Sequence, residues 1–88
     1  MKVTNMTSSK GNKVANQFIM TDSEGREYFQ SYDSVIAVKC LDGVVELDSN
    51  TWDYSVTTGK YRNQFLGETK KETQAKIDSG EYILANLN

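Results

Sequence analysis

The sequence contains no histidine, no proline and a single cysteine, Cys40, among its 88 residues. Without histidine, the chain lacks the commonest general base and the commonest metal ligand. It also cannot build a Ser–His or Cys–His nucleophile pair within one chain. We therefore expect a protein that binds rather than catalyses, with neither a cofactor nor a metal.

The sequence also has no internal disulfide and no membrane-targeting segment. One cysteine cannot close a disulfide within the chain, and residues 1–5 do not begin a signal peptide. No apolar run approaches the roughly 18 residues of a membrane span. We expect a cytoplasmic protein that does not contact membranes.

The charges are unevenly distributed along a chain whose net charge is −2. Residues 21–55 contain eight acidic residues and two basic ones, whereas residues 1–20 contain three lysines and no acid. One interpretation is that the ends and the middle attract each other across the fold. The other is that the middle forms one acidic face for a basic partner, from Asp22, Glu24, Glu27, Asp42, Glu46, Asp48 and Asp53.

Apolar and polar residues alternate through the first half of the chain, a pattern typical of β-strands. In residues 14–20 the alternation places Val14, Phe18 and Met20 on one face, although Asn16 interrupts it. The predicted strands cover residues 2–8, 14–20, 26–31, 34–39, 44–48 and 82–87, with a further short strand or edge at 52–55.

The clearest local signal is the Asp42-Gly43 step between two apolar runs. Both residue types tolerate positive φ, so this pair predicts a two-residue type I′ hairpin turn. It indicates that residues 34–39 and 44–48 are antiparallel neighbours.

The second half of the chain favours helices. Thr57 or Thr58 caps a first predicted helix that ends before Gly67, although residues 61–65 also alternate as a strand would. Thr69-Lys70-Lys71-Glu72 is a capping box for a second helix over 70–79. We predict a single α+β domain over residues 1–88: an antiparallel meander of four to six strands with one or two C-terminal helices on one face.

The acidic residues and the single cysteine are the remaining candidates for a metal site or a reactive group. The acids Asp42, Glu46, Asp48 and Asp53 match no calcium-loop spacing, so they predict no metal site. Cys40 is expected to be a small buried or half-buried hydrophobic residue.

The segment 52–67 combines aromatic, basic and hydroxyl side chains. Trp52, Tyr61, Phe65 and Leu66 are expected in the core. The remaining polar residues predict a partner-binding site, in which a helix N-terminus and two bases receive a phosphate or carboxylate and an aromatic ring fills a pocket or stacks on a base. These residues are Tyr54, Thr57, Thr58, Lys60 and Arg62.

Several runs, among them residues 15–18, 28–32, 52–55, 57–63, 65–69 and 79–82, resemble small uncharacterised proteins of tailed bacteriophages. The resemblance spans nearly the whole chain, and its motifs carry no known chemistry. It implies a phage gene product acting in the bacterial cytoplasm. Compact acidic phage proteins of this size often bind and block host proteins, including defence nucleases.

Three functions follow from the sequence. The leading hypothesis is a non-enzymatic protein that binds a host or phage protein through the acidic face. The second is nucleic-acid binding through Lys60, Arg62 and the basic N-terminus, which the overall acidity disfavours. The third is a self-assembling structural role, which leaves monomer and homodimer open.

Overall fold

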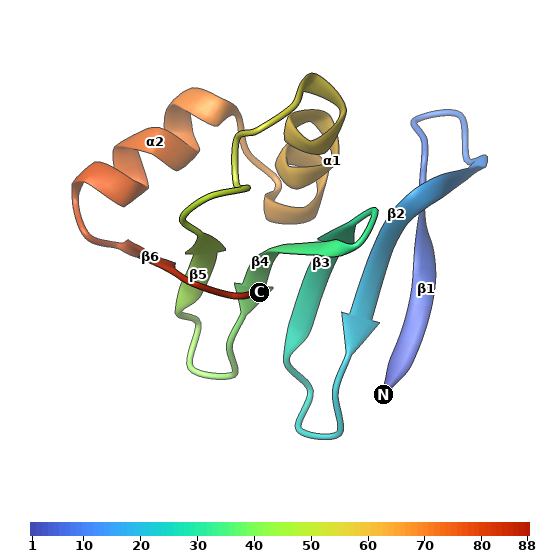
Figure 1. The fold of residues 1–88 in the computed structure, drawn as a ribbon, viewed down its shortest axis with the longest axis horizontal. Coiled ribbons are helices and arrows are strands. Elements are labelled where there is room, and N and C mark those ends of the chain that lie inside the picture. The colour runs from blue at the N-terminus through green and yellow to red at the C-terminus, as the bar shows by residue number, and fades with distance from the viewer.

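Alternating apolar and polar residues fold the first half of the chain into five consecutive antiparallel strands, as predicted. The computed structural model describes residues 1–88 (Figure 1). Each strand pairs with the next one along the chain. The strands are β1 (Lys2–Thr7), β2 (Lys13–Thr21), β3 (Glu27–Ser31), β4 (Ser34–Lys39) and β5 (Val45–Asp48).

Two helices and one more strand complete the chain. Helix α1 (Val56–Leu66) and helix α2 (Lys70–Asp78) carry the chain back, so that β6 (Tyr82–Ala85) pairs with β5 in parallel. The predicted α+β class, with six strands and two C-terminal helices, is confirmed. The predicted antiparallel meander is wrong at its last strand, because β6 runs parallel to β5. Parallel neighbours need a long crossover connection, and α1 and α2 provide it.

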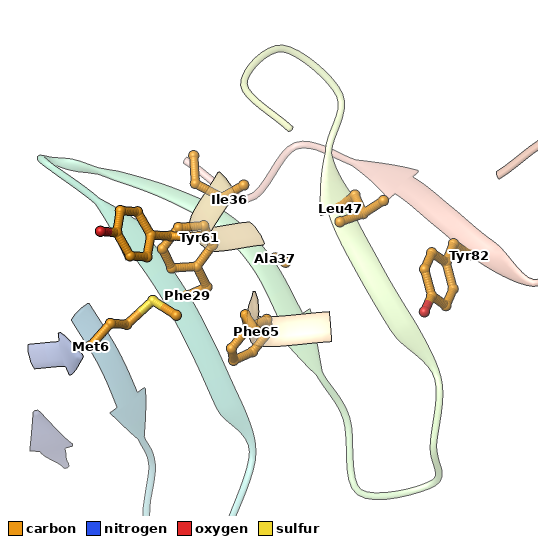
Figure 2. Close-up of a cluster of buried hydrophobic side chains, with 8 residues drawn as sticks. All are labelled: Met6, Phe29, Ile36, Ala37, Leu47, Tyr61, Phe65 and Tyr82. Carbon is orange, nitrogen blue, oxygen red and sulfur yellow. The ribbon is translucent and has the colours of Figure 1, made fainter. Parts of the chain in front are cut away.

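The core lies between the sheet and α1. Phe29, Ala37 and Leu47 are fully buried on three neighbouring strands, and Tyr61 and Phe65 of α1 cover them (Figure 2). The Phe29 and Phe65 rings lie 5.8 Å apart, centroid to centroid. The prediction of Tyr61 and Phe65 as core residues is therefore confirmed, while Trp52 and Leu66 pack at the edge of the core and are partly buried.

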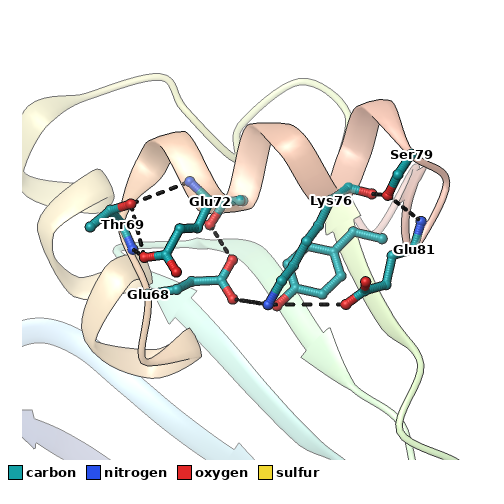
Figure 3. A network of polar contacts seen from close by, with 8 residues as sticks. Glu68, Thr69, Glu72, Lys76, Ser79 and Glu81 are labelled. Carbon is teal, nitrogen blue, oxygen red and sulfur yellow. Dashed lines mark hydrogen bonds and ion pairs between the residues drawn. The ribbon is translucent and has the colours of Figure 1, made fainter.

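Helix α2 has no broad apolar stripe, and the buried carboxylate of Glu68 holds it against β6 instead. The Glu68 side chain is only 5% exposed and accepts hydrogen bonds from Lys76 Nζ at 2.8 Å, Thr73 Oγ1 at 2.6 Å and Tyr82 Oη at 2.7 Å (Figure 3). Burial raises the pKa of Glu68, but these hydrogen bonds outweigh it and lower the pKa overall. The predicted capping box is present beside this network.

The structure corrects the predicted faces of β2. Asn16 adopts a left-handed conformation, with φ of 64°, and breaks the alternation of the strand. As a result Val14 and Ile19 both pack against the core. Phe18 and Met20 pair with residues of β1 on the opposite face, so the expected grouping of Val14 with them is wrong.

Three local predictions also change. Only Gly43 of the Asp42-Gly43 pair has positive φ, and its amide donates to the Cys40 carbonyl, so the loop is a three-residue turn with Gly43 at the bulge position rather than type I′. Residues 52–55 form turns, not a strand. Ser55, rather than Thr57 or Thr58, caps α1.

No helix of the structure is both long enough and apolar enough to cross a bilayer.

The packing of Phe65 predicts its effect on stability. Phe65→Ala removes the ring stacked on Phe29 and leaves a cavity, so the free energy of unfolding should fall by about 3–5 kcal/mol. Urea denaturation followed by circular dichroism measures this change. Val56→Ala, at a side chain that is 92% exposed in the same helix, serves as the control and should change stability little.

Candidate functional site

The predicted partner-binding residues separate into two surfaces and a buried group. Four of them line a shallow depression of about 750 Å³ beside α1, here called the α1 depression. Its walls are residues 53–56 of the loop before α1, then Gly59, Lys60, Arg62 and Asn63 of α1, and Lys70 of α2. Asp42 lies in the β4–β5 turn, Glu46 lies on β5, and Asp48 and Thr58 are buried.

Arg62 fixes the loop that enters α1. Its side chain is 1% exposed, and one terminal nitrogen donates to the Trp52 carbonyl at 2.6 Å. The other donates to Asn63 Oδ1 at 3.0 Å, and the guanidinium lies 5.2 Å from the Trp52 ring centroid. Because these contacts occupy it, Arg62 positions the wall of the depression, and a nucleic acid would have to bind without it.

Asp53 links the loop to both helices. One carboxylate oxygen lies 2.7 Å from Lys70 Nζ and the other lies 3.4 Å from Arg62. The hydrogen bond from Lys70 is the main cause that lowers the pKa of Asp53, with a further contribution from Arg62. The carboxylate therefore stays ionised and holds the loop, α1 and α2 in one arrangement.

The reachable groups of the depression are Tyr54, Val56 and Lys60. Tyr54 is 49% exposed and Val56 is 92% exposed, so two apolar side chains stand uncovered at the rim. Thr57 is also exposed on the first turn of α1, but Thr58 is fully buried and hydrogen-bonds Ser31 Oγ at 2.8 Å. Of the predicted set in this segment, Tyr54, Thr57 and Lys60 can therefore reach a partner.

Sequence reasoning missed Val56, Gly59 and Lys70 as lining residues. Gly59 lies inside α1, where glycine is about 1 kcal/mol less favourable than alanine. A methyl group there would meet only the Arg62 guanidinium, at 3.6 Å, which is an ordinary contact. The sequence did carry one signal for Gly59, because a glycine inside a predicted helix is unfavourable and indicates a special role at that position.

Asp48, which was predicted to belong to the acidic face, is used inside the fold. It is 1% exposed, and its carboxylate accepts from the backbone amides of Asn50 at 3.1 Å, Thr51 at 3.0 Å and Leu87 at 2.9 Å. Burial raises the pKa of Asp48, but these hydrogen bonds and that of the Thr51 hydroxyl outweigh it and lower the pKa. Asp48 is therefore not available to a partner.

The sheet face opposite the helices, here called the open face, presents a row that is apolar on five of the six strands. Residues paired directly across strands share a face of a sheet, and neighbouring residues along a strand alternate. The row next to the core residues Phe29, Ala37 and Leu47 therefore points away from the helices. It runs across all six strands through Val3, Met20, Tyr28, Val38, Glu46 and Ile83.

Acidic residues gather at one end of the open face, here called the acidic end. The β2–β3 and β4–β5 turns lie side by side there (Figure 1). The Leu41 side chain of one turn lies against Gly25 of the other, 3.3 Å from where a Cβ atom would be. They bring together Asp22, Glu24, Asp42 and Glu46. Glu27 instead pairs in register with Lys39 on the helix side, and Asp53 lies in the α1 depression.

One arginine partly neutralises the acidic end. Arg26 lies 2.7 Å from Asp22 and 3.3 Å from Glu24. Desolvation raises the pKa of Asp22, but hydrogen bonds from Arg26 and the Tyr28 hydroxyl outweigh it and bring the pKa to about 2. Asp22 therefore stays ionised, and paired with Arg26, down to strongly acidic pH.

Cys40 beside the acidic end is half-buried, as expected. Its Sγ donates to Glu46 Oε2 at 3.5 Å. Burial, followed by the hydrogen bond to Glu46, raises the pKa of the Cys40 thiol. The thiol is therefore protonated near neutral pH, which disfavours a nucleophilic role.

A family model covers nearly the whole chain. Residues 1–81 match DUF8033, described as a family of unknown function, and the chain belongs to this family. No curated protein and no solved structure matches the chain. The residues that bind a partner are therefore inferred from the geometry of the two surfaces.

Gly59→Ala should stabilise the protein. The substitution removes the conformational freedom of a helix-interior glycine, and the added methyl group makes only ordinary contacts, so unfolding should require about 0.5–1 kcal/mol more. Urea denaturation of the variant and the parent measures the difference. A loss of stability would show that α1 needs the glycine for its own packing.

Asp48 predicts a pH dependence of stability. Its folded-state pKa lies below its unfolded value, so its contribution is present above about pH 4 and is lost as the pH falls through the lowered folded value. Asp48→Asn should cost about 2 kcal/mol at neutral pH and flatten the acid side of the stability profile. Asp33→Asn, at an exposed carboxylate, is the control and should keep the parent profile.

Proposed function

We propose that this chain, a member of the DUF8033 family, is a non-enzymatic protein-binding domain that holds a basic protein partner on its open face. The observation that carries the proposal is the row across all six strands, apolar on five of them and acidic at Glu46 of β5, on the face that the helices leave uncovered. The missing histidine and the protonated Cys40 thiol support a binding role over catalysis.

The exposure of the row supports contact with a protein. Val3 is 55% exposed and Ile83 is 48% exposed, at opposite edges of the sheet, and Met20 and Tyr28 between them are half-buried. Protein interfaces commonly combine an apolar centre with a polar rim, and contiguous exposed apolar surface on a soluble domain marks interaction sites. The open face has exposed apolar residues at both edges, a buried Val38 in the middle and the Glu46 carboxylate beside it.

The acidic end specifies the charge of the partner. Its four carboxylates face one arginine, which leaves a net charge of −3 from Asp22, Glu24, Asp42, Glu46 and Arg26. A basic surface would be attracted to this end, and the attraction would speed association more than it tightens the complex. Mobile ions screen exposed charges beyond about 8–10 Å, so binding should weaken in salt.

The resemblance to small proteins of tailed bacteriophages suggests the setting. In this proposal the domain acts in the cytoplasm of a bacterial host and blocks a host protein. A protein that handles nucleic acid is a suitable target, because such proteins carry the basic surfaces that the acidic end would attract.

Two neighbouring residues of β6 provide the test. Ile83 lies on the open face and Leu84 on the helix side, with exposed fractions of 48% and 43%. The tagged protein would be used to recover its partner from nuclease-treated bacterial lysate, and the affinity of the purified pair would be measured at low and high salt. Ile83→Lys should weaken binding about tenfold or more, because it removes an apolar contact and repels a basic partner. Leu84→Lys should leave binding unchanged.

Three results would contradict the proposal. They are equal affinity for the Ile83→Lys variant, affinity independent of salt, and recovery only in the absence of nuclease. A sedimentation experiment that finds a homodimer lost in Ile83→Lys would assign the open face to self-assembly instead.

A further inference from the structure

We infer that the α1 depression is a second binding site, which takes an acidic segment of a protein chain against the backbone of α1 at Gly59. It lies on the helices, whereas the open face lies on the opposite side of the sheet, so the inference does not depend on the proposed function. Four features support it: an unexplained glycine, unpaired positive charge, exposed apolar groups and a fixed wall.

Neither a positive φ nor a close neighbouring side chain requires glycine at position 59. The nearest side-chain atoms to an added methyl group would be those of the Arg62 guanidinium, at 3.6 Å, which is an ordinary contact. Glycine in a helix interior is unfavourable, and one use of it is to let another group approach the backbone closely. The Arg62 guanidinium lies on the Cβ side of Gly59, and the part of the glycine that lines the depression is where an occupant would approach the backbone.

The free charge of the depression is positive. Lys60 is exposed and forms no ion pair within the chain. Asp53 is the one acid on the wall, and its two oxygens are already directed to Lys70 and Arg62. An occupant therefore meets lysine ammonium groups and a neutralised carboxylate, which favours carboxylates on the occupant.

The shape favours a chain segment over a small anion. A second shallow depression, of about 630 Å³, follows α2 and is lined by Lys70, Lys71, Gln74, Ala75 and Asp78. Lys70 belongs to both, so the two depressions adjoin. Together they follow a path along the two helices with three lysines, Lys60, Lys70 and Lys71, and two acids, Asp53 and Asp78.

Exposed apolar groups beside the lysines favour a protein segment. Tyr54 and Val56 stand at the rim and would cover an apolar side chain of the occupant. The contacts of Arg62 and the Asp53–Lys70 ion pair hold this rim before any partner arrives. A rim that is already ordered loses less conformational entropy on binding.

The test selects the occupant without assuming its sequence. A library of random short peptides displayed on phage would be selected against the purified full-length protein, and the enriched peptides would be synthesised and titrated by fluorescence anisotropy. We expect enrichment of peptides with several Asp or Glu residues around an apolar residue. Lys60→Glu should weaken their binding about tenfold or more, because it replaces attraction with repulsion.

Gly59→Ala separates binding from folding. This variant is expected to be the more stable protein, so weaker peptide binding by it cannot be attributed to unfolding. The charge control is Lys10→Glu, the same change at an exposed lysine in the β1–β2 turn, which should leave peptide affinity unchanged. Ile83→Lys should also leave it unchanged, which distinguishes this site from the open face.

Several outcomes would overturn the inference. One is a selection that enriches no acidic peptides, and another is acidic peptides that bind Lys60→Glu and Gly59→Ala as well as the parent. Self-association that Lys60→Glu abolishes would assign the depression to a second copy of the chain. Retardation of single-stranded DNA that Lys60→Glu abolishes would assign it to nucleic acid.

Discussion

The parallel pairing of β6 with β5 is the constraint on which the rest of the structure depends. Every earlier strand follows its neighbour through a short turn, but a parallel neighbour must begin at the same end of the sheet as the strand before it. The chain therefore crosses back over the sheet, and α1 and α2 are that crossover. Because the crossover covers one face, it creates both the core beneath α1 and the open face on the other side.

Buried charges stabilise the three junctions of this crossover. Asp48 fastens the exit from β5, Arg62 fastens the loop before α1, and Glu68 fastens the link between α1 and α2. Each has hydrogen-bond partners close by, which offsets the cost of removing a charge from water. The apolar core is small, with nine buried hydrophobic residues, so these polar junctions determine how the helices sit on the sheet.

Local chemistry was predictable from the sequence, and non-local partners were not. The capping box of α2 depends on residues three apart, and the strands β1 to β5 depend on short-range alternation, so both could be predicted. Asn16 shows the limit, because a single left-handed residue reverses the faces that alternation assigns. The parallel direction of β6 depends on contacts across the fold that no local pattern encodes.

The candidate site shows the same division. Sequence composition predicted that the segment around Tyr54 and Lys60 is unusual, and the structure places both on one depression. It could not predict that Arg62 turns inward, because a basic residue in a helix is ordinarily exposed and the contacts with Trp52 and Asp53 that explain its burial lie outside the helix. The predicted acidic face likewise contained too many residues. Asp48 is buried and accepts a hydrogen bond from the Leu87 amide, and Glu27 lies on the helix side opposite Lys39.

The segregation of charge along the sequence becomes a segregation of charge in space. The turns of the acidic middle segment meet at one end of the sheet (Figure 1), while Lys60, Lys70 and Lys71 line the two depressions along the helices. A fold whose ends and middle simply neutralised one another would have paired these lysines with the turn acids. Only Lys70 of the three is in an ion pair, and its partner Asp53 belongs to the loop before α1 rather than to the acidic end. Two surfaces of opposite charge on opposite faces do not compete for space, so one small domain has room for two different protein contacts at once.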